Sequence, residues 1–306
     1  MTEVMVSQRS QEWFELRQRL QLTASRFGEA LGVGRGRPFD FFQSLISDDA
    51  CYQEKEEDAC TAHGTRVEPI IDEAYQLLTG NTTQSSGVWL PKEGSILHGL
   101  CGATPDGKIV SSSDPKKLTG LVEYKAPVYQ LYDSSKLLHG IPRNYMAQIQ
   151  GQMAISGAPW CDFMAVCIKT KQLSLKRVYA NPIYWQFISK KLQQFCLIFR
   201  DAKQRRKKKQ QFLYLPGVQR LKNEPMARQL FPGEVNIIVK NLIQRNSKGQ
   251  YKSPSGSGTW LDFDFLMCLE PSKNPILEGY DYECRLRDID REIKQGQSSS
   301  PGKDIR

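Results

Sequence analysis

The sequence predicts a mixed α/β fold in which helices flank a central mixed β-sheet. The first observation is the order of the predicted elements, which runs helices, mixed strands, a helix, two strands and a helix. The second is a change of hydrophobic period, because residues 65–78 carry apolar side chains at helical spacing whereas residues 121–125 alternate like a strand. The third is the short apolar run 163–168, which is typical of a buried strand.

Short helices are expected at the N-terminal end. Residues 10–31 predict a helix, a tight junction and a second helix that starts near Phe27. Ser25 has the residue type of a helix N-cap, and Glu29 then lies in the first turn, where a carboxylate is favourable. A Gly/Arg loop (32–38), a further helix (39–45) and an acidic surface segment (47–58) are predicted to follow.

Residues 65–78 predict a helix that ends before Gly80, a residue type favoured just past a helix. Thr65 and Glu68 have the spacing of a capping box, in which the glutamate only satisfies the helix start. Pro69 fits a first turn, so the start of this helix stays open. Glu68 therefore has a structural interpretation that competes with any functional one.

Residues 108–110 and 121–125 predict a β-hairpin with a turn-rich connection. Asp106 precedes the first strand in a Pro-Asp-Gly turn. On the second strand Glu123 and Lys125 share one face and Tyr124 points to the other. The hairpin is expected to bring Asp106 close to Glu123. Two earlier strands are predicted over 86–90 and 95–102.

Two carboxylates and one ammonium at a strand end give the strongest functional signal. Asp106 and Glu123 offer the oxygen ligands that Mg²⁺ prefers, and Lys125 can face a phosphate or an attacking water. Each piece alone is ordinary, because Pro-Asp-Gly is a common turn and Glu-x-Lys a common surface ion pair. Inside an apolar run, however, two charges are costly without a partner or a metal. We therefore interpret this combination as a hydrolytic Mg²⁺ site.

The next predicted elements are the remaining strands of the sheet and two helices that cover it. A helix is expected over 144–155 after Pro142, and Gln148 and Gln152 share one of its faces at i, i+4. Strands are predicted over 163–168 and 173–178, and a helix over 184–200.

Six short motifs occur in order over roughly residues 10 to 200. They are Trp13-x-x-x-Arg17, Thr23-Ala24-Ser25, Gly64-x-x-x-Glu68, Thr104-Pro105-Asp106-Gly107, Glu123-x-Lys125 and Tyr145-Met146-x-Gln148-x-Gln150. Together they resemble the lambda exonuclease (YqaJ-type) branch of the PD-(D/E)xK nuclease superfamily. The resemblance implies a restriction-endonuclease-like core, an α/β fold with a central mixed sheet flanked by helices.

The resemblance also implies the roles of the site residues. Asp106 and Glu123 are expected to be metal ligands, with the backbone carbonyl of Tyr124 as a further ligand. Glu68 is expected to be a ligand or to organise the water around the metal. Lys125 is expected to orient the attacking hydroxide and to balance charge on the phosphate. Gln148 completes the catalytic set by positioning either the lysine or the water. The implied cofactor is Mg²⁺, with Mn²⁺ able to replace it.

A second implied group binds a terminal 5′ phosphate and consists of Arg17, Ser25 and Thr104. The alternatives are an exposed helix arginine and a plain N-cap. The sequence also departs from the family, which often has an arginine shortly after the Glu-x-Lys strand, whereas no basic residue precedes Lys136 here. Strand-end recognition and the ring-shaped trimer of some relatives are therefore less strongly implied. Arg35 and Arg37 either contact a DNA backbone or are solvated.

These inferences predict a Mg²⁺-dependent DNA exonuclease that acts 5′ to 3′ on duplex ends in recombination, repair or viral-type genome processing. The alternatives are an endonuclease or RNA-cleaving relative, and an inactive nucleic-acid-binding relative. The net charge of +9 suits a polyanionic partner. A single-strand annealing protein is a further expected partner, because family members often work with one.

The organisation of the chain divides at about residue 210. Residues 1–210 are predicted to form the nuclease domain, and 211–306 an extension of unknown role whose last residues, 295–306, are disordered. The basic run 203–209 is a solvated helix end, a phosphate-tracking patch or a nuclear import signal. No membrane span is predicted, and eight cysteines without CxxC spacing indicate reduced thiols in an intracellular protein.

Overall fold

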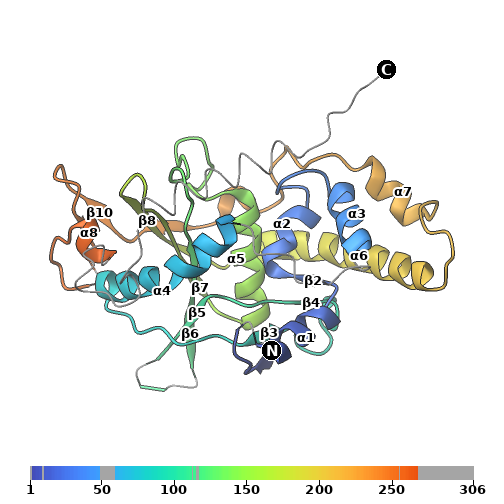
Figure 1. Cartoon of the computed structure of the whole chain (residues 1–306), viewed down its shortest axis with the longest axis horizontal. Coiled ribbons are helices and arrows are strands. Elements are labelled where there is room, and N and C mark those ends of the chain that lie inside the picture. The colour runs from blue at the N-terminus through green and yellow to red at the C-terminus, as the bar shows by residue number, and fades with distance from the viewer. Residues whose placement is uncertain are drawn as a thin grey trace.

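The computed structural model describes residues 2–8, 10–48, 59–111, 113–114, 117–254 and 256–267. Most of the predicted acidic segment 47–58 and the predicted disordered end 295–306 lie outside the described residues. Figure 1 shows α4 and most of the sheet on one side of α5, and α2, α3, α6 and α7 on the other.

A five-stranded mixed sheet forms the centre of the fold, in the order β5–β6–β7–β8–β9. Strands β6 and β7 are parallel because α5 crosses over between them, and the other neighbouring pairs are antiparallel. The strands are β5 (Gly107–Val110), β6 (Leu118–Lys125), β7 (Trp160–Cys167), β8 (Gln172–Tyr179) and β9 (Val239–Asn241). The predicted hairpin and the two predicted later strands are all present.

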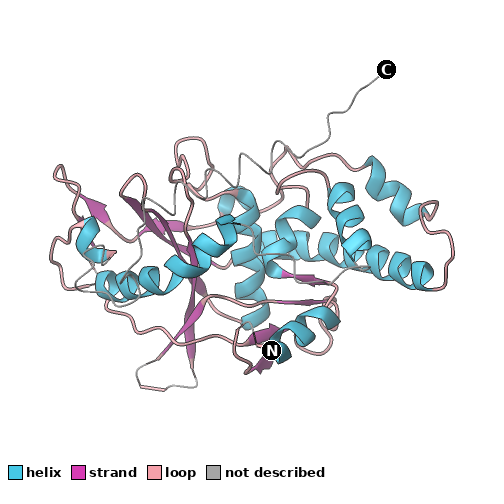
Figure 2. Ribbon diagram, in the orientation of Figure 1, coloured by secondary structure: helices cyan, strands magenta, loops and turns pink. Residues whose placement is uncertain are grey.

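Both faces of this sheet are covered by helices (Figure 2). Phe163 and Ala165 of β7 face the apolar cluster that contains α2, α3, α5, α6 and α7. Met164 and Val166 face the cluster that contains α4 and α8. The predicted fold class, a mixed sheet flanked by helices, is confirmed. The helices are α1 (Gln11–Arg19), α2 (Phe27–Ala30), α3 (Pro38–Asp48), α4 (Ala59–Thr79), α5 (Arg143–Ser156), α6 (Pro182–Lys207), α7 (Pro216–Asn223) and α8 (Phe263–Leu266).

Two small strand pairs support the N-terminal half. Strand β1 (Thr2–Val4) pairs antiparallel with β3 (Val88–Leu90), and β2 (Leu22–Thr23) pairs in parallel with β4 (Cys101–Gly102). An ion pair of 2.6 Å between Lys108 Nζ and Glu3 Oε2 connects the start of the chain to β5. These contacts fix the segment that leads to Asp106.

The helix α4 starts earlier than predicted. Thr65 lies inside it and donates its hydroxyl to the carbonyl of Thr61 at 3.0 Å, so the predicted capping box is wrong. Pro69 also lies inside the helix and removes one backbone donor there, and Figure 1 shows a bend within α4. Gly80, with a φ of 73°, ends the helix as predicted.

Ser25 is not a helix N-cap. It lies inside the 3₁₀ turn Ala24–Arg26, whose N-cap position is held by Thr23, and no side-chain hydrogen bond caps this turn. The chain enters α2 directly from the turn, so no extended residue remains at position 25 to act as a cap. Glu29 does lie in the first turn of α2, as predicted.

Only Cys101 and Gly102 of the predicted strand 95–102 are extended. The chain from 95 to 100 forms turns in which the amide of Leu100 donates to the carbonyl of Leu97 at 3.0 Å. Both leucines are buried. Consecutive turns therefore bury the two leucines, whereas Ile96 of the same predicted strand is exposed.

The described part of the C-terminal segment packs on the same core. It includes a 3₁₀ turn, Glu234–Asn236, and strand β9, which forms the edge of the central sheet. Phe263 and Leu266 of the apolar stretch after Trp260 are buried beside α4. The division at residue 210 stays a prediction.

The remaining strands are β10 (Gln244–Arg245) and β11 (Tyr251–Lys252), which pair with each other.

The basic run begins in the last turns of α6, which ends at Lys207. Arg205 forms an i, i+4 ion pair of 3.2 Å with Asp201. The roles of the basic run 203–209 in phosphate tracking or nuclear import remain predictions. Among the described residues, no helix combines the length and the apolar character needed to cross a membrane.

Candidate active site

The β5–β6 hairpin places Asp106 beside the strand that carries Glu123. Gly107 pairs with Val122, so Asp106 lies beside Glu123, near the C-terminal end of β6. The backbone amide of Tyr124 donates to Asp106 Oδ2 at 2.6 Å. The predicted approach of Asp106 to Glu123 is therefore present, and it depends on the register of this hairpin.

The carboxylate of Glu123 is only 1% exposed and accepts hydrogen bonds from three side chains. Lys125 Nζ and Gln148 Nε2 donate to Oε1, and Gln152 Nε2 donates to Oε2 at 2.7 Å. The period-two alternation of β6 puts Lys125 on the face of Glu123, as predicted.

Gln152 was not among the predicted site residues. It lies one turn after Gln148 on α5, and both amides reach the same carboxylate. The signal in the sequence is the i, i+4 spacing of the two glutamines. Neither glutamine is exposed, so α5 presents two buried amide donors to β6.

The carboxyl group of Asp106 is buried close to the charges of Glu123 and Glu68. Burial raises the pKa of this carboxyl well above its usual range, and the charges of Glu123 and Glu68 raise it further, while Lys125 opposes the shift. Burial alone would lower the pKa of Lys125, but the charges of Glu123 and Asp106 outweigh it. The pKa of Lys125 thus lies above its ordinary value, and the lysine carries a proton at neutral pH.

Glu68 reaches this group from α4. It is partly buried, and its charge acts on Asp106. Since Thr65 does not cap the helix, the competing structural interpretation of Glu68 is lost. The structure therefore brings Glu68, Asp106, Glu123 and Lys125 within electrostatic reach of one another.

Tyr124 links α4 to the catalytic strand. Its side chain points away from Glu123, and its hydroxyl donates to Asp72 Oδ1 at 2.6 Å. Its backbone carbonyl accepts a hydrogen bond of 3.0 Å from Lys125 Nζ. Thr83 Oγ1 also donates to Asp72, at 2.8 Å. Asp72 lies one turn after Glu68 on α4. The hydrogen bond between Tyr124 and Asp72 therefore connects the helix that carries Glu68 to the strand that carries Glu123.

Arg17, Ser25 and Thr104 also come together. Arg17 Nη1 donates to Thr104 Oγ1 at 3.3 Å, and Arg17 Nη2 donates to Thr23 Oγ1 at 3.2 Å. The hydroxyls of Thr23 and Ser25 lie 3.2 Å apart. Thr23 is thus a member of the group that the sequence did not single out. Thr104 lies two residues before Asp106, so this group adjoins the carboxylates.

The residues present fit a hard divalent cation by their donor type. The carboxylates of Glu68, Asp106 and Glu123 and the carbonyl of Tyr124 are all oxygen ligands. A cation would also relieve the repulsion that raises the pKa of Asp106. Within the described part of the chain, however, no three His, Cys, Asp or Glu side chains converge as a ready metal site. Metal binding therefore remains a proposal.

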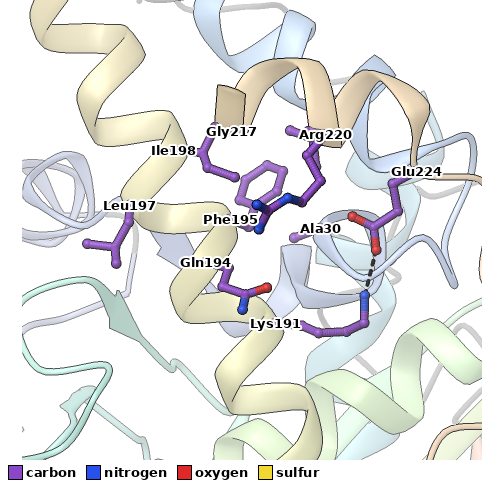
Figure 3. A pocket seen from close by; sticks show the side chains of 10 residues that line it. Ala30, Lys191, Gln194, Phe195, Leu197, Ile198, Gly217, Arg220 and Glu224 are labelled. Carbon is purple, nitrogen blue, oxygen red and sulfur yellow. Dashed lines mark hydrogen bonds and ion pairs between the residues drawn. The ribbon is translucent and has the colours of Figure 1, made fainter. Parts of the chain in front are cut away.

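A cavity of about 230 Å³ lies elsewhere, between α6 and α7 (Figure 3). Phe195 and Ile198 line it, and Lys191 and Glu224 form an ion pair of 2.5 Å beside it. None of the predicted site residues line this cavity. It is separate from the carboxylate group.

Comparison with known proteins identifies the domain that holds both groups. The model of the YqaJ-like viral recombinase domain matches residues 12–159. The crystal structure of an alkaline exonuclease, LHK-Exo, from Laribacter hongkongensis is 25% identical, with a TM-score of 0.51, and the alignment covers 65% of this chain and 97% of that one. LHK-Exo in complex with dAMP is 24% identical, with a TM-score of 0.52 and the same coverage. No curated protein matches the chain. The segment that carries the six motifs is therefore similar to the YqaJ-like viral recombinase domain.

Proposed function

We propose that this protein is a Mg²⁺-dependent exonuclease that hydrolyses duplex DNA from its ends, in the 5′ to 3′ direction. The YqaJ-like domain and the likeness to an alkaline exonuclease support nuclease action on DNA. The observation that carries the proposal is the β5–β6 hairpin, which brings Asp106 beside Glu123 and directs Lys125 to the same face.

The side chains divide the work of phosphodiester hydrolysis. Protonated Lys125 donates hydrogen bonds, so it can orient the attacking water and offset charge on the phosphate. Gln148 and Gln152 hold the Glu123 carboxylate in place. Asp106, Glu123, Glu68 and the carbonyl of Tyr124 would hold the cation. When bound, Mg²⁺ supplies Lewis-acid activation of water and stabilises the leaving oxygen.

Recognition of a 5′ phosphate is assigned to the group around Arg17. Its guanidinium provides several donors, and the hydroxyls of Thr23, Ser25 and Thr104 surround it. The Arg17 guanidinium also lies 4.2 Å from the centre of the Trp13 ring, which limits its orientation. A phosphate held here places the first phosphodiester of the strand near Asp106.

The test uses three DNA substrates with Mg²⁺. They are a linear duplex with 5′ phosphates, the same duplex with 5′ hydroxyls, and a covalently closed circle. We expect digestion of the linear forms only, faster with the 5′ phosphate. Cutting of the circle would show an endonuclease instead. If no DNA is cut, an RNA duplex and an RNA single strand distinguish an RNA-cleaving enzyme from an inactive one.

Arg17→Ala is expected to reduce the preference for 5′-phosphorylated over 5′-hydroxyl ends. A charge-assisted contact of this kind contributes about 1.5–3 kcal/mol, which corresponds to about ten- to a hundredfold in the ratio of the two rates. Arg19→Ala, at an exposed position of the same helix, is the control and should leave the ratio unchanged. An unchanged ratio in Arg17→Ala would show that this residue does not read the end.

Tyr124→Phe is expected to lower both stability and turnover. Loss of a partly buried hydrogen bond to a carboxylate lowers the free energy of unfolding by about 1.5–3 kcal/mol, and a looser α4 lowers kcat about tenfold. Tyr75→Phe is the control. Tyr75 belongs to the same apolar cluster, but its hydroxyl donates at 2.7 Å to Asp162, which is not one of the candidate active-site carboxylates. It should lose similar stability and keep its kcat. Equal effects on kcat in the two variants would contradict a positioning role for Tyr124.

A further inference from the structure

Lys176 is a buried lysine that the candidate active site does not use. It lies on β8 and is 9% exposed. Its Nζ donates to the backbone carbonyls of His139 at 3.3 Å and Gly140 at 3.2 Å. Within the described residues, no carboxylate forms an ion pair with it. A buried ammonium without a counter-ion is costly, and burial accordingly lowers the pKa of Lys176.

Lys176 lines a polar cavity of about 240 Å³. Besides Lys176, hydroxyl and amide groups of Ser134, Ser174 and Asn241 line it, and Tyr132 and Phe163 form aromatic walls. None of the lining residues is acidic. The cavity therefore combines one positive charge with neutral hydrogen-bonding groups, which is the composition of an anion site.

The cavity adjoins the candidate active site on the same face of the sheet. The strand register places Glu123 opposite Phe163, Phe163 opposite Lys176, and Lys176 opposite Asn241. These residues form one row across four strands. Since neighbouring strands lie about 4.8 Å apart, Lys176 is about 10 Å from the strand of Glu123.

The loop 131–140 lies against the ammonium group of Lys176. Gly140 has a φ of 64°, a conformation that favours glycine. A Cβ atom at this position would collide with Lys176 Nζ. Tyr132 of the same loop lies 5.6 Å from the Tyr145 ring, and Lys125 Nζ lies 5.2 Å from that ring. Aromatic side chains thus form a continuous wall from the catalytic lysine to the cavity.

We propose that this cavity is a second phosphate-binding subsite with Lys176 as its cation, occupied by a phosphate of the nucleic-acid strand or of the released nucleotide. The inference rests on the proposed function, because that function supplies a phosphate next to Glu123. The ligand supplies the counter-charge that Lys176 lacks, and Ser174 and Asn241 supply further donors.

The first test measures binding in EDTA, where hydrolysis is absent. The ligands are a deoxynucleoside 5′-monophosphate, the matching deoxynucleoside and a duplex with 5′ phosphates, and the readouts are calorimetric titration and gel shift. Lys176→Met is expected to weaken binding of the nucleotide, the duplex or both by about tenfold or more. Lys240→Met removes an exposed lysine from the other face of the sheet and should bind like wild type.

The second test separates phosphate binding from a purely structural tether. Asn241→Asp places a carboxylate opposite Lys176 on the neighbouring strand, so the ammonium gains a counter-ion. We expect the melting temperature to stay equal or rise, while phosphate binding falls about tenfold. This variant remains decisive if Lys176→Met does not fold.

The outcomes identify the source of the phosphate and can overturn the subsite. Weaker binding of the nucleotide in Asn241→Asp indicates the released product, and weaker binding of the duplex alone indicates the strand. If both ligands bind Asn241→Asp as they bind wild type, Lys176 only tethers the loop and the proposal is wrong. Because no readout depends on cleavage, a wild-type protein that binds phosphate but cuts no DNA would refute the proposed function and leave the subsite intact.

Discussion

Asp106→Asn is expected to abolish cleavage without lowering the stability of the protein. Loss of one charged ligand should reduce turnover by a factor of at least about 10²–10³, because the cation loses the carboxylate that holds it beside the attacked phosphate. Asparagine keeps an oxygen that can accept from the amide of Tyr124. Stability is not expected to fall, since burial and the charge of Glu123 oppose ionisation of Asp106. The measurements are cleavage with Mg²⁺, duplex binding by gel shift and the melting temperature without metal.

The same change at another buried aspartate is the control. Asp162 is buried on β7, where Arg177 Nε and Asp162 Oδ1 lie 2.7 Å apart. Asp162→Asn should lower the melting temperature, because it weakens a buried ion pair, and leave turnover of the folded protein unchanged. Retained cleavage in Asp106→Asn with Mg²⁺ would overturn the site assignment. Glu123→Ala is also expected to abolish cleavage, but it removes the acceptor of three donors and should lose stability as well.

Lys125→Met is expected to lower kcat by about 10²–10³ with little change in the Mg²⁺ concentration that gives half-maximal activity. Methionine retains the apolar stem and removes the ammonium that lies between Glu123 and the carbonyl of Tyr124. Glu123 keeps its two glutamine donors, so the carboxylate should stay in place. The measurement is single-turnover cleavage over a series of Mg²⁺ concentrations.

Two further variants sharpen this test. Lys125→Arg should not restore the rate, because the planar guanidinium cannot replace a compact ammonium at this depth. Lys169→Met is the control, since Lys169 is exposed and lies 5.1 Å over the ring of Tyr129. A wild-type rate in Lys125→Met would rule out a catalytic role for the lysine. A large rise in the Mg²⁺ concentration needed for half-maximal activity would instead show that Lys125 helps to position the cation.

Local patterns were sufficient where one hydrophobic period describes a whole element. The alternation in 121–125 predicted that Glu123 and Lys125 share a face, and the structure places their side chains in contact. The helix over 144–155 was predicted from its spacing and from Pro142, and α5 has nearly these bounds.

Local patterns failed where tertiary packing replaces local capping. The Thr65–Glu68 spacing predicted a helix start, but α4 continues through it because its apolar face is buried against the sheet. Ser25 has the right residue type for a cap, yet the chain passes from a 3₁₀ turn directly into α2. Residues 95–100 have the composition of a strand and bury their leucines in turns instead. Propensity is a weak guide when burial decides the conformation.

The sequence by itself determined the hairpin, the order of the motifs and the shared face of Glu123 and Lys125, because period-two alternation and motif spacing are local properties. Only the tertiary structure decided that Gln152 and Thr23 join these groups, that Asp72 fixes Tyr124, and that β9 puts Asn241 beside Lys176. These contacts join residues far apart in the sequence or on different elements. They depend on strand register and on the position of each helix over the sheet, which no local pattern specifies.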